Sequence, residues 1–140
     1  MIILDTNVVS EFMTSPPSTA VLEWLNAQEP SSLYITSISV AEICFGLQAM
    51  SQGRRRRLLE DRFERFISQA FSSRVLHFDE AAGRIFGEIK AYRKAIGRPL
   101  SDFDGQIAAI ARVHGFAIAT RNLADFEHCL VDLIDPFAAS

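Results

Sequence analysis

The sequence lacks the long apolar segments of membrane and exported proteins. No apolar run approaches the roughly 18 residues that a membrane-spanning helix needs. A basic-then-apolar leader is also missing, because the first basic residue is Arg54. We therefore expect a cytoplasmic protein without membrane contacts.

Cysteine and histidine are scarce. The two cysteines, Cys44 and Cys129, have apolar neighbours and are not spaced as metal ligands. We expect both to be reduced residues of the core rather than a disulfide. His77, His114 and His128 show no ligand spacing either, and we expect them to be structural.

Basic residues are missing from positions 1–53, which carry five acids. All 14 Lys and Arg residues lie in 54–140, and the whole chain has a net charge of -3. This is not the strongly basic balance of a protein that holds nucleic acid by charge alone. A polyanionic substrate would need divalent cations bound at the acidic residues.

The residues that are present favour an α/β fold. The chain is 49% hydrophobic with 11 Phe, which is enough to fill the core of one domain over 1–140. Short apolar runs alternate with longer helical patterns, which indicates βαβ units and a parallel sheet covered on both faces. We predict strands at 2–4, 33–35, 75–78, 116–119 and 131–134, with helices that begin near 8, 17, 37, 54, 79 and 101.

Asp5 directly follows the first predicted strand. The carboxyl ends of parallel strands are where open α/β sheets bind ligands. A carboxylate at this buried edge is costly unless a cation or hydrogen bonds hold it. The alternative is that Asp5 only caps the helix that starts near Asn7.

Glu42 lies in a helix whose neighbouring residues are almost all apolar. Such a carboxylate either occupies a narrow exposed stripe or points into a functional pocket. Gly46 follows one turn later and costs about 1 kcal/mol relative to Ala in a helix. We expect Gly46 to serve close packing or access beside Glu42.

Asp104 falls in the first turn of a predicted helix, where the helix dipole favours acids. The apolar residues Ile107, Ala108 and Ala111 share its face, so we expect Asp104 to point inward. Asp102 is two positions away and should point elsewhere. Thr120 and Asn122 follow another strand, as Asp5 follows the first, and the two strand ends predict a polar crevice.

Four segments together resemble the PIN-domain ribonuclease toxins of the VapC family, especially the FitB type. They are Leu-Asp-Thr-Asn at 4–7, Ser-Val-Ala-Glu-Ile at 39–43, Asp-Gly-Gln-Ile-Ala-Ala at 104–109 and Thr-Arg-Asn-Leu-Ala-Asp-Phe at 120–126. Each segment alone is a weak signal, whereas all four in order over nearly the whole chain are specific. The resemblance implies a three-layer α/β/α PIN-like domain with a short, mainly parallel sheet.

The resemblance also implies a site. Asp5, Glu42 and Asp104 match the family's three acids that hold Mg²⁺ or Mn²⁺, and Thr6 and Thr120 match residues that line the pocket. Many members carry a fourth acid where this chain has Asn122, so we expect one tightly held ion and a weaker second site. We assign Asp125 to helix capping or to a structural hydrogen bond.

The implied function is a metal-dependent endoribonuclease, the toxin of a type II toxin–antitoxin module. Its implied partners are an RNA substrate and a small DNA-binding antitoxin whose tail covers the active site. A homodimer, and a higher assembly with the antitoxin, are also expected. The first helices support pairing, because they carry more apolar residues than one small sheet needs, namely Val9, Phe12, Val21, Trp24 and Leu25.

Two rival functions and the role of one basic segment remain open at this stage. Asn122 allows a catalytically weak module that only binds RNA or the antitoxin. A receiver-like or phosphatase-like domain would use Asp5 as a phospho-acceptor, but the Thr120 segment offers no Lys, and the second Asp usual in such phosphatases is missing after Asp5. The arginines at 54–57 are either a solvated helix start or an anchor for RNA phosphates or acidic groups of the antitoxin.

Overall fold

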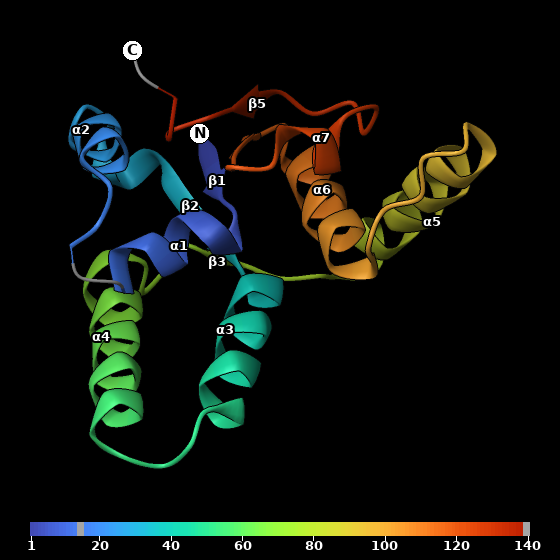
Figure 1. Cartoon of the computed structure of the whole chain (residues 1–140). Helices are drawn as coiled ribbons and strands as arrows, with labels where there is room; N and C mark the ends of the chain where they lie inside the picture. The colour runs from blue at the N-terminus through green and yellow to red at the C-terminus, as the bar shows by residue number, and fades with distance from the viewer. Residues whose placement is uncertain (14–15, 139–140) are drawn as a thin grey trace.

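A parallel sheet of five strands, in the order β3-β2-β1-β4-β5, forms the centre of the fold in the computed structural model, which describes residues 1–13 and 16–138 (Figure 1). All four strand pairs are parallel, and β1 lies in the middle. The strands are β1 (Ile2–Leu4), β2 (Leu33–Thr36), β3 (Val75–Leu76), β4 (Ala117–Ala119) and β5 (Leu133–Ile134).

The side chains of successive residues in a strand point to opposite faces of the sheet. Ile2 and Leu4 join one apolar cluster, whereas Ile3 between them joins the other. The same alternation separates Ile118 from Ala119 in β4. Continuous apolar runs such as 2–4 are therefore the expected sequence of strands that are buried on both sides.

Helices cover both faces and complete the three layers that the sequence predicts (Figure 1). The first cluster packs mainly under α1 (Thr6–Met13), α2 (Thr19–Asn26), α3 (Ser37–Ala49) and α4 (Arg54–Ala70). The second packs mainly under α5 (Glu80–Ala95), α6 (Asp102–His114) and α7 (Leu123–Phe126). The α/β fold class is thereby confirmed.

Several element ends follow the predicted signals. The Asp79 side chain accepts a hydrogen bond from the Ala82 amide and caps α5, while Gly115 ends α6 in the left-handed conformation at φ 69°. The cap of α3 is Thr36, the last residue of β2, whose hydroxyl accepts a hydrogen bond from the Ser39 amide. The sequence did not predict the 3₁₀ turn Pro30–Ser32 or α7, which are too short to show a period.

The prediction for the cysteines was half right. Both thiols are free, and Cys129 is buried, but Cys44 is exposed. The buried face of α3 consists of Ser39, Ile43 and Leu47, spaced four residues apart, so the residue after Ile43 points outward. None of the helices in residues 1–13 and 16–138 is long and apolar enough to cross a membrane.

Arg93 is a buried basic residue that the sequence pattern did not single out. Its guanidinium is buried, with the residue 4% exposed, and donates to the carbonyl oxygens of Arg98, Asp125 and Glu127. The distances to the last two oxygens are 3.0 and 2.8 Å. Arg93 thus ties α5 to the end of α7.

We expect Arg93→Ala to lower the free energy of unfolding by about 2 to 4 kcal/mol, because buried carbonyls lose their donor. Urea denaturation measures this change. Arg84→Ala is the matched control on the same helix, since the Arg84 side chain is 77% exposed and only pairs with Glu80; it should stay within about 0.5 kcal/mol of wild type. Equal losses in both variants would contradict the role of Arg93.

Candidate functional site

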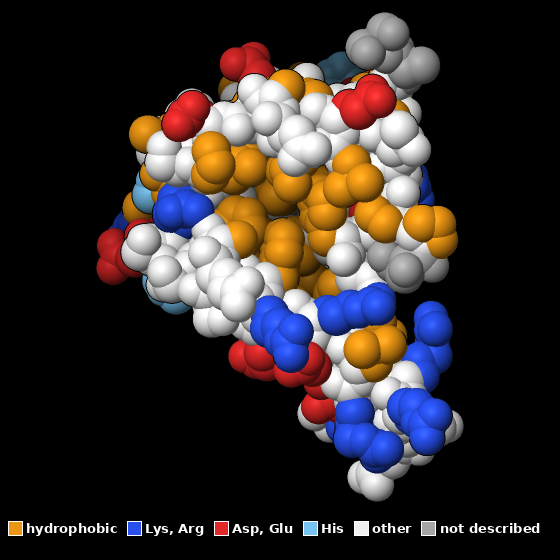
Figure 2. Space-filling model, turned by 90° about the vertical axis from the view of Figure 1, so that its left-hand side faces the viewer, with side chains coloured by type: hydrophobic (Ala, Val, Ile, Leu, Met, Phe, Trp, Pro, Cys, Tyr) orange, Lys and Arg blue, Asp and Glu red, His pale blue; other side chains and the backbone are white. Residues whose placement is uncertain are grey.

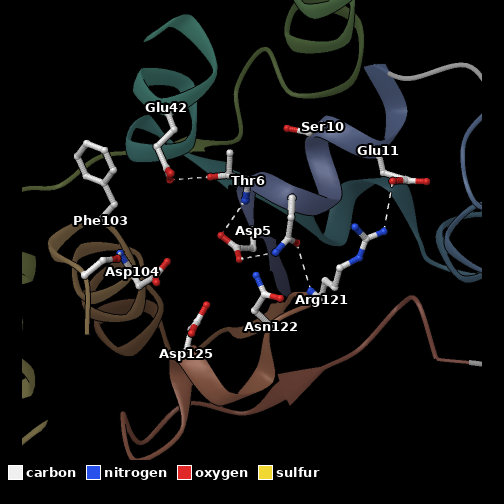
Figure 3. A pocket seen from close by; sticks show the side chains of 12 residues that line it. Asp5, Thr6, Ser10, Glu11, Glu42, Phe103, Asp104, Arg121, Asn122 and Asp125 are labelled. Carbon is white, nitrogen blue, oxygen red and sulfur yellow. Dashed lines mark hydrogen bonds and ion pairs between the residues drawn. The ribbon is translucent and has the colours of Figure 1, made fainter. Parts of the chain in front are cut away.

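A pocket of about 690 Å³ opens at the carboxyl edge of β1 and β4 (Figure 3). Four segments distant in sequence meet there: the start of α1, the middle of α3, the start of α6 and the β4–α7 turn. We call it the acidic pocket, after the three predicted acids that line it, namely Asp5, Glu42 and Asp104.

Asp5 lies deepest, with 5% of its surface exposed. One carboxylate oxygen accepts from the Thr6 amide at 2.8 Å. The other accepts from the Thr120 hydroxyl at 2.8 Å and from the Asn7 side chain at 3.3 Å. The Asp5 amide also donates to the Ala119 carbonyl at 2.9 Å, so β1 and β4 are joined at the site itself.

Thr6 connects Asp5 to Glu42. Its hydroxyl donates to Glu42 at 2.8 Å and lies 2.8 Å from the Ser39 hydroxyl. Glu42 therefore points into the pocket rather than along an exposed stripe (Figure 3). Gly46 leaves open space on the same side of α3, where an added Cβ would meet nothing within 4 Å.

Asp104 also points as predicted. Ser101 caps α6 by accepting from the Asp104 amide at 3.1 Å, and the half-buried carboxylate of Asp104 lines the pocket. Asp102 points elsewhere and pairs with Lys90 at 2.8 Å. Phe103 lies at the rim, 48% exposed, and was not anticipated as part of the site.

The β4–α7 turn differs from the prediction in two respects. Thr120 is fully buried and does not line the pocket; its hydroxyl donates a hydrogen bond to Asp5. Asn122 does line the pocket. Asp125 is not a helix cap: it lies in the first turn of α7 and its side chain faces the pocket near Asp104 (Figure 3). A four-residue helix gave no periodic signal from which this direction could be predicted.

Asn7 and Arg121 are further residues of the site that the sequence pattern did not identify. The Asn7 side chain donates toward Asp5 and accepts from the Arg121 amide at 3.2 Å. The Arg121 guanidinium pairs with Glu11 at 3.5 Å and lies 3.8 Å from the centre of the Phe137 ring. These contacts fix the turn after β4 against α1.

Each of the three acids has a pKa above its ordinary value, so the site disfavours its charged form. Burial raises the pKa of Asp5 from 3.8 to about 6; hydrogen bonds from Thr120 and Thr6 oppose the shift, while the charges of Asp104 and Glu42 add to it. Burial likewise raises the pKa of Glu42, against the hydrogen bond from Thr6 and with the charge of Asp104. Burial also raises the pKa of Asp104, and the charge of Asp125 adds to that rise.

The donor set fits a hard divalent cation, because it consists of carboxylate, hydroxyl and amide oxygens. Among the described residues, no three Asp, Glu, His or Cys side chains enclose an ion by themselves. Mg²⁺ usually keeps several waters and takes one or two carboxylates. The pocket therefore fits an ion that is bound partly through water.

Comparison with known proteins identifies the class. The PIN domain family model matches residues 2–128, so the chain belongs to the PIN-domain family. The relatives include a VapC ribonuclease and a toxin.

The chain is 44% identical over 137 residues to the VapC ribonuclease Y4jK of Sinorhizobium fredii, covering 98% of each chain. It is 35% identical over 137 residues to the toxin FitB of Neisseria gonorrhoeae, covering 98% of this chain and 99% of FitB. The structure of FitAB bound to an IR36 DNA fragment contains a similar chain, with a TM-score of 0.92 and 34% identity over 100% of this chain and 98% of that one.

The raised pKa of Asp5 makes the stability of the metal-free protein depend on pH. Between pH 4 and 6 the folded state binds more protons than the unfolded state, so stability should fall as the pH rises through this range. At pH 7 the loss attributable to Asp5 is up to about 3 kcal/mol.

Thermal melting in a chelator, from pH 4 to pH 7, measures this dependence. Relative to Asp5→Asn, the wild type should lose stability as the pH rises, because only the wild type carries the titrating carboxyl. Excess Mg²⁺ should reduce the loss. Parallel curves for the two proteins would show that burial of Asp5 costs little.

Proposed function

We propose that this protein is a Mg²⁺- or Mn²⁺-dependent endoribonuclease and the toxin of a type II toxin–antitoxin module. The observation that supports this most is the convergence of Asp5, Glu42 and Asp104, each with a raised pKa, on one open pocket. A bound cation would offset the burial and mutual repulsion that raise these pKa values. The ribonuclease and toxin names of the relatives support RNA as substrate.

In this proposal Asp5 and Asp104 hold the ion, and Glu42 binds it directly or orients the attacking water. When bound, the ion would activate water and neutralise charge on a phosphodiester. Thr120 and the Thr6 amide fix Asp5, and the Thr6 hydroxyl fixes one oxygen of Glu42. This leaves the second Glu42 oxygen available to accept a proton from water.

In our proposal Asp125 takes the role of the fourth acid near the metal, which the neutral Asn122 does not fill. Its carboxylate lies near Asp104 and adds to the rise of the Asp104 pKa. Arg93 holds the Asp125 carbonyl and so fixes the backbone from which the side chain extends. Asn122 contributes at most a neutral oxygen.

We also propose that the chain pairs with a second copy and binds an antitoxin in the cytoplasm. Figure 2 shows apolar side chains gathered on the side of the molecule where α1, α2 and α4 lie. Phe12, Trp24 and Phe66 there remain only partly buried, as an interface would require. A symmetric dimer is the commonest assembly that covers such a face, and light scattering would measure its mass.

The runner-up proposal is a module that binds RNA or antitoxin but cleaves weakly. Asn122 favours it, because this neutral residue stands where the family resemblance implies an acid. The position of Asp125 weighs against it, because the pocket then retains four carboxylates besides Glu11, which pairs with Arg121.

Glu42→Gln should reduce cleavage of single-stranded RNA more than tenfold, because the amide removes the charge and the proton acceptor with little change in volume. Gel analysis of RNA incubated with Mg²⁺ or Mn²⁺ measures the rate. Glu88→Gln, an exposed carboxylate of α5, is the matched control and should cleave as wild type does.

The same metals should raise the melting temperature of the wild type but not of the Asp5→Asn, Asp104→Asn double variant. A wild type that responds to metal but cleaves no RNA would favour the binding module. An undiminished metal response in the double variant would exclude this pocket as the metal site.

Asp125→Asn should remove the weaker of two Mn²⁺ ions, because affinity for hard cations follows the number of charged oxygens. Calorimetric titration counts the ions. Asp132→Asn changes an exposed acid outside the pocket and should leave the count unchanged. If Asn122→Asp adds an ion while Asp125→Asn changes nothing, then Asp125 is not the fourth acid.

A further inference from the structure

A second hollow adjoins the acidic pocket on its α4 side. It has a volume of about 310 Å³ and lies between α1, α3 and α4. Thr6, Ser10 and Glu42 line both cavities, so the two adjoin at the Glu42 side chain. A nucleotide strand with a phosphate in the acidic pocket can therefore reach the α4-side hollow with a neighbouring group.

The walls of the α4-side hollow are mainly apolar and contain one cation. Met13, Ile43, Leu47 and Leu59 supply the apolar surface, and Arg55 supplies the guanidinium. The volume is at the lower end of the range for small-ligand sites. Flat apolar faces with polar edges, as nucleobases have, match such walls.

Gly46 keeps the α4-side hollow open. It lines the hollow from α3, and a Cβ at this position would meet no atom within 4 Å. The glycine is not required by close helix packing, and it costs helix stability relative to Ala. The space that it leaves is therefore available to a ligand.

Arg55 is available for a ligand as well. The next residue, Arg56, pairs with Glu60 at 2.7 Å and bonds to Gln48 and the Met50 carbonyl. Arg55, in contrast, makes no hydrogen bond or ion pair with the residues that the structure describes. Basic residues at a helix N-terminus oppose the helix dipole, so Arg55, unpaired among the described residues, does not stabilise α4 (basic side chains at this end are seen in Figure 2).

We propose that the α4-side hollow binds the base of a nucleotide that flanks the cleaved phosphodiester in single-stranded RNA. The apolar walls contact the faces of the base, and Arg55 donates to its edge. Guanine is the best match, because its O6 and N7 accept two hydrogen bonds from one guanidinium. This subsite rests on the proposed ribonuclease function and gives it a sequence preference.

We favour RNA over a protein side chain as the occupant, because the α4-side hollow lies directly beside the proposed catalytic acids. A base is attached one sugar away from the phosphate that the metal site would hold, and the α4-side hollow shares Glu42 and Thr6 with that site. The acidic pocket itself repels a polyanion, so affinity for RNA has to come from base contacts and from free cations such as Arg55.

Gly46→Leu tests the inference by filling the α4-side hollow. A pool of short single-stranded RNAs with a randomised centre is cleaved with Mn²⁺, and the cut sites are sequenced. The wild type should prefer guanine at one position beside the cut. The variant should lose that preference and show a KM raised about tenfold, the size of one lost base contact.

Gly87→Leu is the matched control, because Gly87 lies on α5 with equally open space around it. It should keep the wild-type preference and KM. The metal-induced rise in melting temperature should persist in Gly46→Leu, which shows that the fold and the metal site survive. Arg55→Gln should weaken the guanine preference, whereas Arg57→Gln, on the same turn but not in the hollow, should leave it.

The outcomes separate the inference from the proposed function. If wild type and Gly46→Leu cleave the pool with the same preference and KM, the base subsite is wrong and the ribonuclease function stands. If Gly46→Leu cleaves as wild type does but no longer binds its antitoxin, the α4-side hollow belongs to the protein partner and the inference is overturned. If the wild type cleaves no RNA with either metal, the proposed function itself fails.

Discussion

The burial of one carboxylate at the end of the central strand is the constraint on which the site depends. Asp5 is removed from water and held by Thr120, Thr6 and Asn7, while its own amide joins β1 to β4. A buried anion is costly, so its surroundings must either supply donors or leave room for a cation. This pocket does both. Thr6, whose amide donates to Asp5, also holds Glu42 in place through its hydroxyl.

The directions of Asp5 and Asp104 could be predicted from sequence, because each lies at a position with a simple geometric meaning. Asp5 follows a buried strand, and Asp104 shares the apolar face of α6 at helical spacing. The five parallel strands were found for the same reason, since short apolar runs that alternate with helical patterns are typical of βαβ units.

The remainder of the site could not be predicted, because its geometry comes from tertiary contacts. Asp125 faces the pocket from a helix too short to show a period, and Arg93, on another helix, holds its backbone. The helix α3 is apolar on nearly every side, so sequence alone did not show that Cys44 is exposed or that Glu42 faces the pocket. The sequence predicts Thr120 at the pocket wall, since neither its burial nor its hydrogen bond to Asp5 can be inferred from spacing.

The order of strands in the sheet has a consequence during synthesis. The strand β1 is made first but lies between β2 and β4, and β4 is made only at Ala117–Ala119. Until then Asp5 lacks the Thr120 donor, and the opposite wall of its pocket does not exist. Domains generally fold as units during translation, so a nascent chain of this topology cannot complete the pocket until β4 and the turn that follows it have left the ribosome.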